Sequence, residues 1–254
     1  MLPIPRITWA RRLLSFSDMR RLAQICLLLT LTTVGGSRAY SAEDFTLTAE
    51  VKLVRSDTKQ PLKDYSRSVL WLVPVEDRFK PATSADPHAR MLQKDKRFEP
   101  DLLIIPVGTY VDFPNLDPWF HNVFSLFRGK RFDLGLYQAG AQRSVRFDQA
   151  GVSYLFCNIH PEMSAVIVAV DSQWYGASDA SGKIRISNIP RGKYVLHVWH
   201  ENSSPELLAS MQRVIEITDN RVLSPITVAV QPQTQGHKNK YGKDYDPDVF
   251  KQEY

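Results

Sequence analysis

Cysteine is scarce in this 254-residue chain, which contains only Cys26 and Cys157. Cys26 lies in the apolar run 22–34, so Cys157 is the only cysteine in the rest of the sequence. A framework of internal disulfides is therefore excluded. An unpaired thiol calls for a reason, which is either burial as a small apolar side chain or a chemical role such as metal ligation.

Hydrophobic runs as long as a membrane span are also absent. The longest apolar run is near the start of the chain. The run 22–34 follows a basic segment that ends at Arg21 and precedes small residues that end at Ala39. This order is typical of a secretory signal, with an uncleaved membrane anchor as the alternative. We predict that residues 1–39 are a signal peptide, that the protein is periplasmic or secreted, and that no stable membrane span remains after removal of this leader.

The sequence after residue 39 has no excess of either charge. The chain has 32 basic and 27 acidic residues, and six of the basic and one of the acidic residues lie in 1–39, which leaves 26 of each. The basic character therefore belongs to the leader. A balanced remainder gives no reason to expect nucleic acid or an anionic surface as a partner.

Long amphipathic helices are not indicated either, whereas short strand signals are frequent. Apolar and polar residues alternate over 45–53, which predicts a half-buried strand. The polar segment 81–97 is expected to be a long surface connection. Turn-rich stretches separate several of the remaining strand candidates, and this pattern predicts β-sandwiches. These candidates are 69–73, 102–107, 109–113, 122–127, 144–147, 152–157, 165–170, 184–187, 194–199, 211–217 and 226–230.

The stretch YLFCNIHPEM, residues 154–163, places Cys157, His160 and Met163 within seven positions. Copper that cycles between two oxidation states is held by two imidazoles and one thiolate in a plane, with a weak axial thioether. His121, which follows a predicted strand and turn, offers the second imidazole. Cys157 ends a predicted strand and His160 and Met163 follow on the next loop, so these groups can converge at one end of a sandwich. Zinc is the competing metal, but a thioether is a poor zinc ligand.

Each of these residues also has a purely structural interpretation. Cys157 can be a buried thiol, His160 an ordinary loop histidine and Met163 a core side chain. The four groups in combination favour metal ligation. A second metal site at His197 and His200 is not expected, because these residues lie on opposite faces of a predicted strand.

The ligand pattern resembles that of a cupredoxin of the plastocyanin and amicyanin type over roughly residues 44–171. Two family motifs carry the resemblance, and they are matched by Gly108, Asn115, His121, Asn122 and Val123, and by Cys157, His160, Pro161 and Met163. The resemblance implies one type 1 copper ion with His121, Cys157 and His160 as equatorial ligands and Met163 as the axial ligand. It also implies that the Asn122 side chain ties the two ligand loops together by hydrogen bonds.

The sequence after residue 170, which includes SDASGKIRISNIPRGKYVLHVWH, is similar to the carboxypeptidase regulatory, or transthyretin-like, module. We therefore expect an all-β protein, with a cupredoxin Greek-key β-sandwich at 44–170 followed by a small transthyretin-like β-sandwich at 171–230. The tail 231–254 is polar and is expected to be mobile or to pack only locally. This order of segments resembles that of exported cupredoxin-like proteins that carry the family name of methylamine utilisation proteins.

A copper ion with four protein ligands has no open position for a substrate, so we do not expect an enzyme. The resemblance implies an exported type 1 (blue) copper protein that carries one electron to or from a redox partner protein. One alternative is extracytoplasmic copper binding and delivery, although chaperone sites favour exposed methionines and this sequence has few. The other is a structural or adhesion module with a vestigial copper site, against which the intact ligand set weighs.

Overall fold

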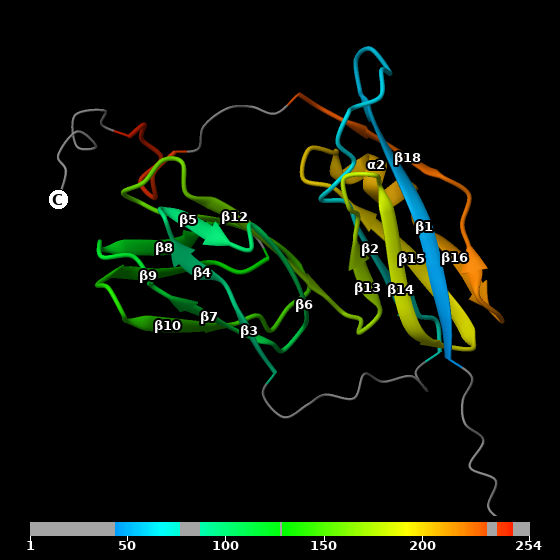
Figure 1. Ribbon diagram of the computed structural model, residues 1–254, viewed down its shortest axis with the longest axis horizontal. Helices are drawn as coiled ribbons and strands as arrows, with labels where there is room; N and C mark the ends of the chain where they lie inside the picture. The colour runs from blue at the N-terminus through cyan, green and yellow to red at the C-terminus, as the bar shows by residue number, and fades with distance from the viewer. Residues whose placement is uncertain (1–43, 77–86, 128, 233–237, 246–254) are drawn as a thin grey trace, which may run out of the picture. The chain divides into compact units, whose positions relative to one another are not determined.

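The computed structural model describes residues 44–76, 87–127, 129–232 and 238–245. The predicted signal peptide, residues 1–39, lies outside the described residues. The described chain is an all-β structure with one short helix, as the sequence predicts (Figure 1). None of the helices in this part of the chain is long and apolar enough to cross a membrane.

The strands form two groups that differ in their partners. One group, the first sandwich, contains β3 (His88–Arg90), β4 (Leu92–Lys94), β5 (Arg97–Glu99), β6 (Leu102–Pro106), β7 (Tyr110–Pro114), β8 (His121–Ser125), β9 (Phe132–Tyr137), β10 (Gln142–Arg146), β11 (Gly151–Phe156) and β12 (Ser164–Val170). The other group, the second sandwich, contains β1 (Asp44–Arg55), β2 (Val69–Pro74), β13 (Tyr175–Ala177), β14 (Lys183–Pro190), β15 (Gly192–Trp199), α2 (Pro205–Ser210), β16 (Arg213–Ile217), β17 (Arg221–Val222) and β18 (Ile226–Val230).

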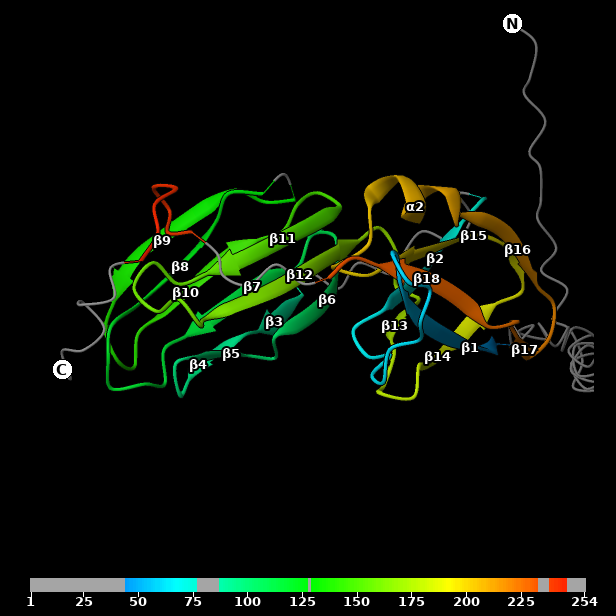
Figure 2. The ribbon, with the colours of Figure 1, turned by 90° about the horizontal axis from the view of Figure 1, so that it is seen from above.

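The first sandwich is built around a mixed sheet in the order β6-β12-β11-β8-β9. In this sheet β12 pairs in parallel with β6 and antiparallel with β11. A smaller sheet has the order β10-β7-β3, and β4 and β5 form a hairpin. Figure 2 shows these strands from a second direction. Alternate residues of the strands point into a common core, which includes Phe113, Val123, Leu155, Cys157 and Met163.

The second sandwich has one sheet in the order β13-β2-β15-β16 and another in which β1 lies between β14 and β17, with β18 also beside β1. The alternating apolar residues of β1 explain its central place, because Leu47, Ala49, Val51 and Leu53 are all buried. They form part of an apolar core with residues such as Leu72 on the facing sheet.

The partners of β1 and β2 correct the predicted start of the first domain. We expected residues 44–170 to form one domain, but β1 pairs antiparallel with β14 and in parallel with β18. Similarly, β2 pairs with β13 and β15. Both early strands therefore belong to the second sandwich, and the first sandwich lies between two segments of it in the sequence. The reason is physical: alternation marks a strand but does not identify its partner.

The predicted surface connection at 81–97 is wrong for the residues of that segment that the structure describes. Three short strands lie within 88–99. The side chains of Met91, between β3 and β4, and of Gln93, in the middle of β4, are fully buried. The Gln93 amide donates to the Phe113 carbonyl oxygen at 3.3 Å. These strands are difficult to predict from the sequence because each is only three residues long and most of the side chains in 88–97 are polar.

Strand β9, which we did not predict, pairs with β8. This pairing contains a bulge beside Asn122. The register shifts between Asn122 and Phe124. Gly135 lies opposite this shift with a φ of +66°, a conformation that a side chain disfavours. The Asp133 carboxylate accepts the Gly135 N–H at 2.9 Å and thereby fixes the bulge beside Asn122.

Candidate metal centre

His121, Cys157 and His160 converge on one point at the end of the first sandwich. The Nδ1 atoms of His121 and His160 are 3.1 Å apart. The Cys157 Sγ atom lies 3.9 Å from the first of these nitrogens and 3.6 Å from the second. Such separations fit three donors that share one ion at bond lengths of about 2.0 to 2.3 Å. In the part of the chain that the structure describes, this is the one group of three such residues close enough to hold a metal.

Two neighbouring strands carry these side chains. His121 is the first residue of β8, whereas Cys157 directly follows β11. The strands pair at Phe124 and Phe156, so the two ligands lie at the same end of the sheet. His160 follows on the loop 157–163, which we call the ligand loop. Short hydrogen bonds close this loop, because Cys157 N–H donates to the Met163 carbonyl and Met163 N–H to the His160 carbonyl, both at 3.1 Å.

The Cys157 thiol is fully buried and surrounded by backbone donors. Burial raises its pKa, while backbone N–H groups of Asn122, Ile159 and His160 that face the sulfur act in the opposite direction. These N–H groups would stabilise a thiolate, which is the form that binds metals. The sulfur is therefore protected from solvent and supplied with donors for the charge that a metal-bound thiolate carries.

The His121 ring is oriented by a buried carboxylate. Its Nε2 atom lies 2.8 Å from Asp117 Oδ2, and both side chains are almost completely buried. An ionised carboxylate only accepts hydrogen bonds, so Nε2 carries the proton and Nδ1 presents its lone pair to the convergence point. Carboxylate–histidine pairs of this kind fix the tautomer and the orientation of metal-binding imidazoles.

Backbone donors keep Asp117 ionised. Its carboxylate also accepts the N–H groups of Asp95, at 2.7 Å, and Lys96, at 2.9 Å, in the β4–β5 turn. Burial alone would raise the pKa of Asp117, but the bonds from Lys96, His121 and Asp95 outweigh this effect and lower it. The N–H of Asp117 itself donates to the Asn115 side-chain oxygen at 3.0 Å, which shapes the loop before His121.

Burial also lowers the pKa of both histidines, so both rings are neutral at neutral pH. The pKa of His160 falls to about 4, first because of desolvation and then because of the nearby His121. For His121, desolvation lowers the pKa although Asp117 opposes the shift. Neutral imidazole is the form that ligates metals.

The donor set fits a metal ion because nitrogen lone pairs of two neutral histidines point toward the same position. With the proton of His121 on Nε2, its Nδ1 lone pair faces Nδ1 of His160 at 3.1 Å in a buried setting. Two neutral imidazole nitrogens at this distance need a proton or a cation between them. Two imidazoles and one thiolate around a single point match the equatorial donors of copper electron-transfer sites. These residues therefore fit a copper ion.

The predicted roles of Met163 and Asn122 have different outcomes in the structure. Met163 is fully buried in the same core as Cys157, and its assignment as an axial ligand stays a prediction. The Asn122 side chain does not tie the two ligand loops together as we expected. Its amide donates to Asp133 on β9 at 2.7 Å, and the backbone N–H of Asn122 faces the Cys157 sulfur instead.

Two contributors to the site were missed in the sequence analysis. Asp117 precedes His121 by four residues in a loop, and an acidic residue shortly before a candidate ligand was an available signal for it. Tyr245 lies in the tail and donates its hydroxyl to the Cys157 carbonyl oxygen at 2.6 Å. No local pattern could have found this contact, because 88 residues separate the two positions.

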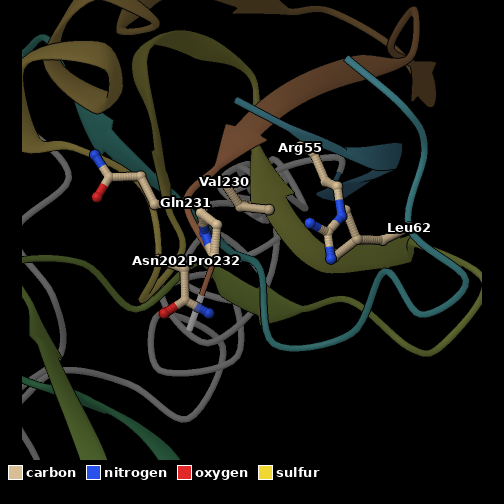
Figure 3. Close-up of a pocket in the computed structure, with 6 residues that line it drawn as sticks. All are labelled: Arg55, Leu62, Asn202, Val230, Gln231 and Pro232. Atoms are coloured by element: carbon tan, nitrogen blue, oxygen red, sulfur yellow. The ribbon is translucent and has the colours of Figure 1, made fainter. Parts of the chain in front are cut away.

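Other places in the described chain offer no comparable chemistry. A pocket of about 160 Å³ on the second sandwich is lined by Arg55, Leu62, Asn202, Val230, Gln231 and Pro232, and no histidine or cysteine is among them (Figure 3). The ring of His197 stacks on Trp71 with 4.8 Å between the ring centroids. His200 is buried and accepts the Asn202 N–H.

Known proteins that are similar to part of this chain include cupredoxins. A purple cupredoxin from Nitrosopumilus maritimus is 26% identical, with a TM-score of 0.30, over 32% of this chain and 99% of its own. A reduced amicyanin variant is 23% identical, with a TM-score of 0.32, over 40% of this chain and 98% of its own. A copper-containing nitrite reductase from Thermus scotoductus SA-01 is 24% identical, with a TM-score of 0.32, over 38% of this chain and 25% of its own. No protein-family model and no curated protein matches the chain.

Proposed function

We propose that this protein is an exported one-electron carrier with one type 1 copper ion. His121, Cys157 and His160 would be the equatorial ligands, and Met163 the axial one. The observation that carries the proposal is the convergence of two imidazole nitrogens and one thiol sulfur, at separations of 3.1, 3.6 and 3.9 Å. Copper in such a site supplies a reversible one-electron couple.

The protein would contribute a donor set that is formed before the metal arrives. Asp117 orients the His121 ring, and backbone N–H groups face the Cys157 sulfur. His121, Cys157 and Met163 are all fully buried, so water has little access to these donors. A site that is held in place and kept dry changes little between oxidation states, and this property favours electron transfer over copper exchange.

His160 offers the route by which electrons would enter and leave. Its side chain is half-buried, whereas the other three proposed ligands are fully buried. Large exposed apolar side chains flank the other histidine of the site: Leu116 and Phe120 are in the loop before His121, and Leu136 is the strand partner of Asn122. They are 56, 55 and 59% exposed, respectively. We infer an apolar docking surface for a redox partner protein around this edge.

The proposed location is the periplasm, and it rests on the leader-like order of residues 1–39. The periplasm is an oxidising compartment, in which a lone exposed thiol would oxidise. Burial of Cys157 fits this setting, because it removes the thiol from solvent.

Repeated reduction and reoxidation of the copper-loaded protein tests the proposal against copper delivery. A carrier keeps its copper in both oxidation states, so a competing cuprous chelator removes little of it over several cycles. A delivery protein releases the ion to the chelator on reduction. Loss of most of the copper in the first cycle would therefore contradict the electron-carrier function and favour delivery.

A further inference from the structure

The segment 238–245, which we call the strap, contacts the ligand loop at two adjacent residues. The Tyr245 hydroxyl donates to the Cys157 carbonyl oxygen at 2.6 Å. The backbone N–H of Lys240 donates to the Asn158 side-chain oxygen at 3.1 Å. The strap, drawn in red in Figures 1 and 2, therefore binds the ligand loop at Cys157 itself and at the next residue.

A third contact joins the strap to the strand that supports the other half of the site. The Lys240 ammonium lies 2.8 Å from Asp133 Oδ2. The other carboxylate oxygen of Asp133 accepts the Asn122 amide at 2.7 Å, and Asn122 directly follows His121. Lys240 is thus bonded to both sides of the site, through Asn158 on the ligand loop and through Asp133 beside β8.

The strap is itself an ordered turn. Its Asn239 side-chain oxygen accepts the N–H groups of Tyr241 and Lys243 at 3.0 and 3.1 Å. The backbone of Asn239 exchanges hydrogen bonds with Lys243 and Gly242, both at 2.9 Å. Gly242 has a φ of +75°, which allows this tight reversal. Because the turn is fixed internally, binding it costs less conformational entropy than ordering a free chain would.

We propose that the strap positions the copper ligand loop, with Tyr245 and Lys240 as the positioning residues. They act through Cys157 and Asn158 and do not touch the metal position. The hydrogen bonds restrain the ligand loop in the geometry that brings Cys157 and His160 to His121. The use of this restraint in copper binding rests on the proposed function. The restraint itself is a property of the metal-free chain.

Burial of Cys157 and Met163 and hydrogen bonds within the loop hold the ligand loop, and the strap adds a restraint from outside it. Within the loop, the closing backbone bonds are those of Cys157 with Met163 and of Met163 with His160. A loop that opens readily would release the metal and would change its geometry on reduction. The strap adds a hydrogen bond to the carbonyl of the cysteine ligand and so opposes such opening.

Hydrogen exchange of the metal-free protein tests the restraint. In Tyr245→Phe, amides of residues 157–163 should exchange about fivefold faster, the factor that corresponds to about 1 kcal/mol for the lost hydrogen bond to the Cys157 carbonyl. Lys240→Met removes the ion pair with Asp133 but keeps the backbone N–H that donates to Asn158, so the same amides should exchange faster by a smaller factor. Amides of β1 and β14 should be unaffected. Lys243→Met in the strap and Tyr65→Phe in the second sandwich are the matched controls. They change the same residue types and leave Tyr245 and Lys240 intact, so both should exchange like the wild type at residues 157–163.

Copper extraction by an excess of chelator then tests the purpose of the restraint. Tyr245→Phe and Lys240→Met should lose copper faster than the wild type and than both control variants. If exchange at 157–163 stays at the wild-type rate in both strap variants, the positioning role is overturned even when the protein binds copper normally. If the wild type fails to form a thiolate–copper site, the proposed function fails, whereas the exchange experiment still decides whether the strap restrains the loop.

Discussion

Asp117 and His121 form a buried pair in which a carboxylate oxygen lies 2.8 Å from the imidazole Nε2 atom. This pair determines which nitrogen of His121 faces Cys157 and His160. The orientation of the ligand thus depends on a residue that does not itself reach the metal position, and it can be tested separately from the ligands.

Replacing Asp117 with alanine should weaken copper binding by about 10- to 100-fold, the usual effect of losing a partner that orients a metal-binding histidine. The ring of His121 would lose the acceptor that fixes its tautomer. Competition with a chelator of known affinity measures the change. Asp148→Ala is the control, because Asp148 is an exposed carboxylate that pairs with Lys130, and its affinity should match the wild type. Equal affinities for the two variants would show that Asp117 does not orient the ligand.

Replacing Met163 with leucine tests the proposed axial ligand. Leucine has a similar volume, so the core around this fully buried position should stay intact. The equatorial donors remain, so copper binding should persist, and so should the intense visible absorption band that a copper–thiolate bond is expected to give. Without a thioether the cupric state is less stabilised, so the reduction potential should rise. A potential unchanged from the wild type, measured by voltammetry, would remove Met163 from the ligand set.

Lowering the pH should destabilise the metal-free protein through His160. Its pKa is lowered to about 4 in the folded state, whereas an unfolded chain has a histidine pKa of about 6.5. The unfolded state therefore binds more protons in between, and the stability falls as the pH drops from about 6.5 to about 4. The midpoint of thermal unfolding in the presence of a chelator measures this loss. His160→Gln should show a smaller decrease over the same range, and an equal decrease would assign the effect to other groups.

Replacing Leu53 with alanine tests the strand assignment of β1. Leu53 is buried in the core of the second sandwich, so the substitution should lower the free energy of unfolding by about 2 to 5 kcal/mol. The copper absorption band should be unchanged, because Leu53 does not belong to the core that contains Cys157. Leu155→Ala, in the core of the first sandwich, should disturb that band. A loss of the band in Leu53→Ala alone would instead place β1 with the copper site.

The sequence was sufficient to predict most of the longer strands and the convergent residues. It was insufficient to predict the short strands within 88–99, the strand β9 and the residues that support the site. The alternation of Leu47, Ala49, Val51 and Leu53 identified a strand, but its pairing with β14 and β18 is a long-range choice that local patterns do not encode. The convergence of His121 with Cys157 could be predicted because four soft donors in one pattern are rarely coincidental.

The groups that hold the site residues in place come from polar segments, whose composition is typical of loops. The β4–β5 turn donates its N–H groups to Asp117, and in this turn Asp95 and Lys96 adopt positive φ angles of 52° and 55°. The composition of such a charged segment does not predict a contact with a buried carboxylate. The polar tail likewise gave no sign that Tyr245 would reach the Cys157 carbonyl.

The visible absorption spectrum of the purified protein with one equivalent of cupric ion, compared with that of Cys157→Ser, tests the central claim most directly. The convergence of one thiolate and two imidazoles predicts an intense thiolate-to-copper band in the wild type, with none in Cys157→Ser. Since Cys157 is buried with its sulfur facing both histidines, serine removes the thiolate but little volume. A wild-type protein that stays colourless with bound copper, or a variant with the same band, would contradict the type 1 copper site.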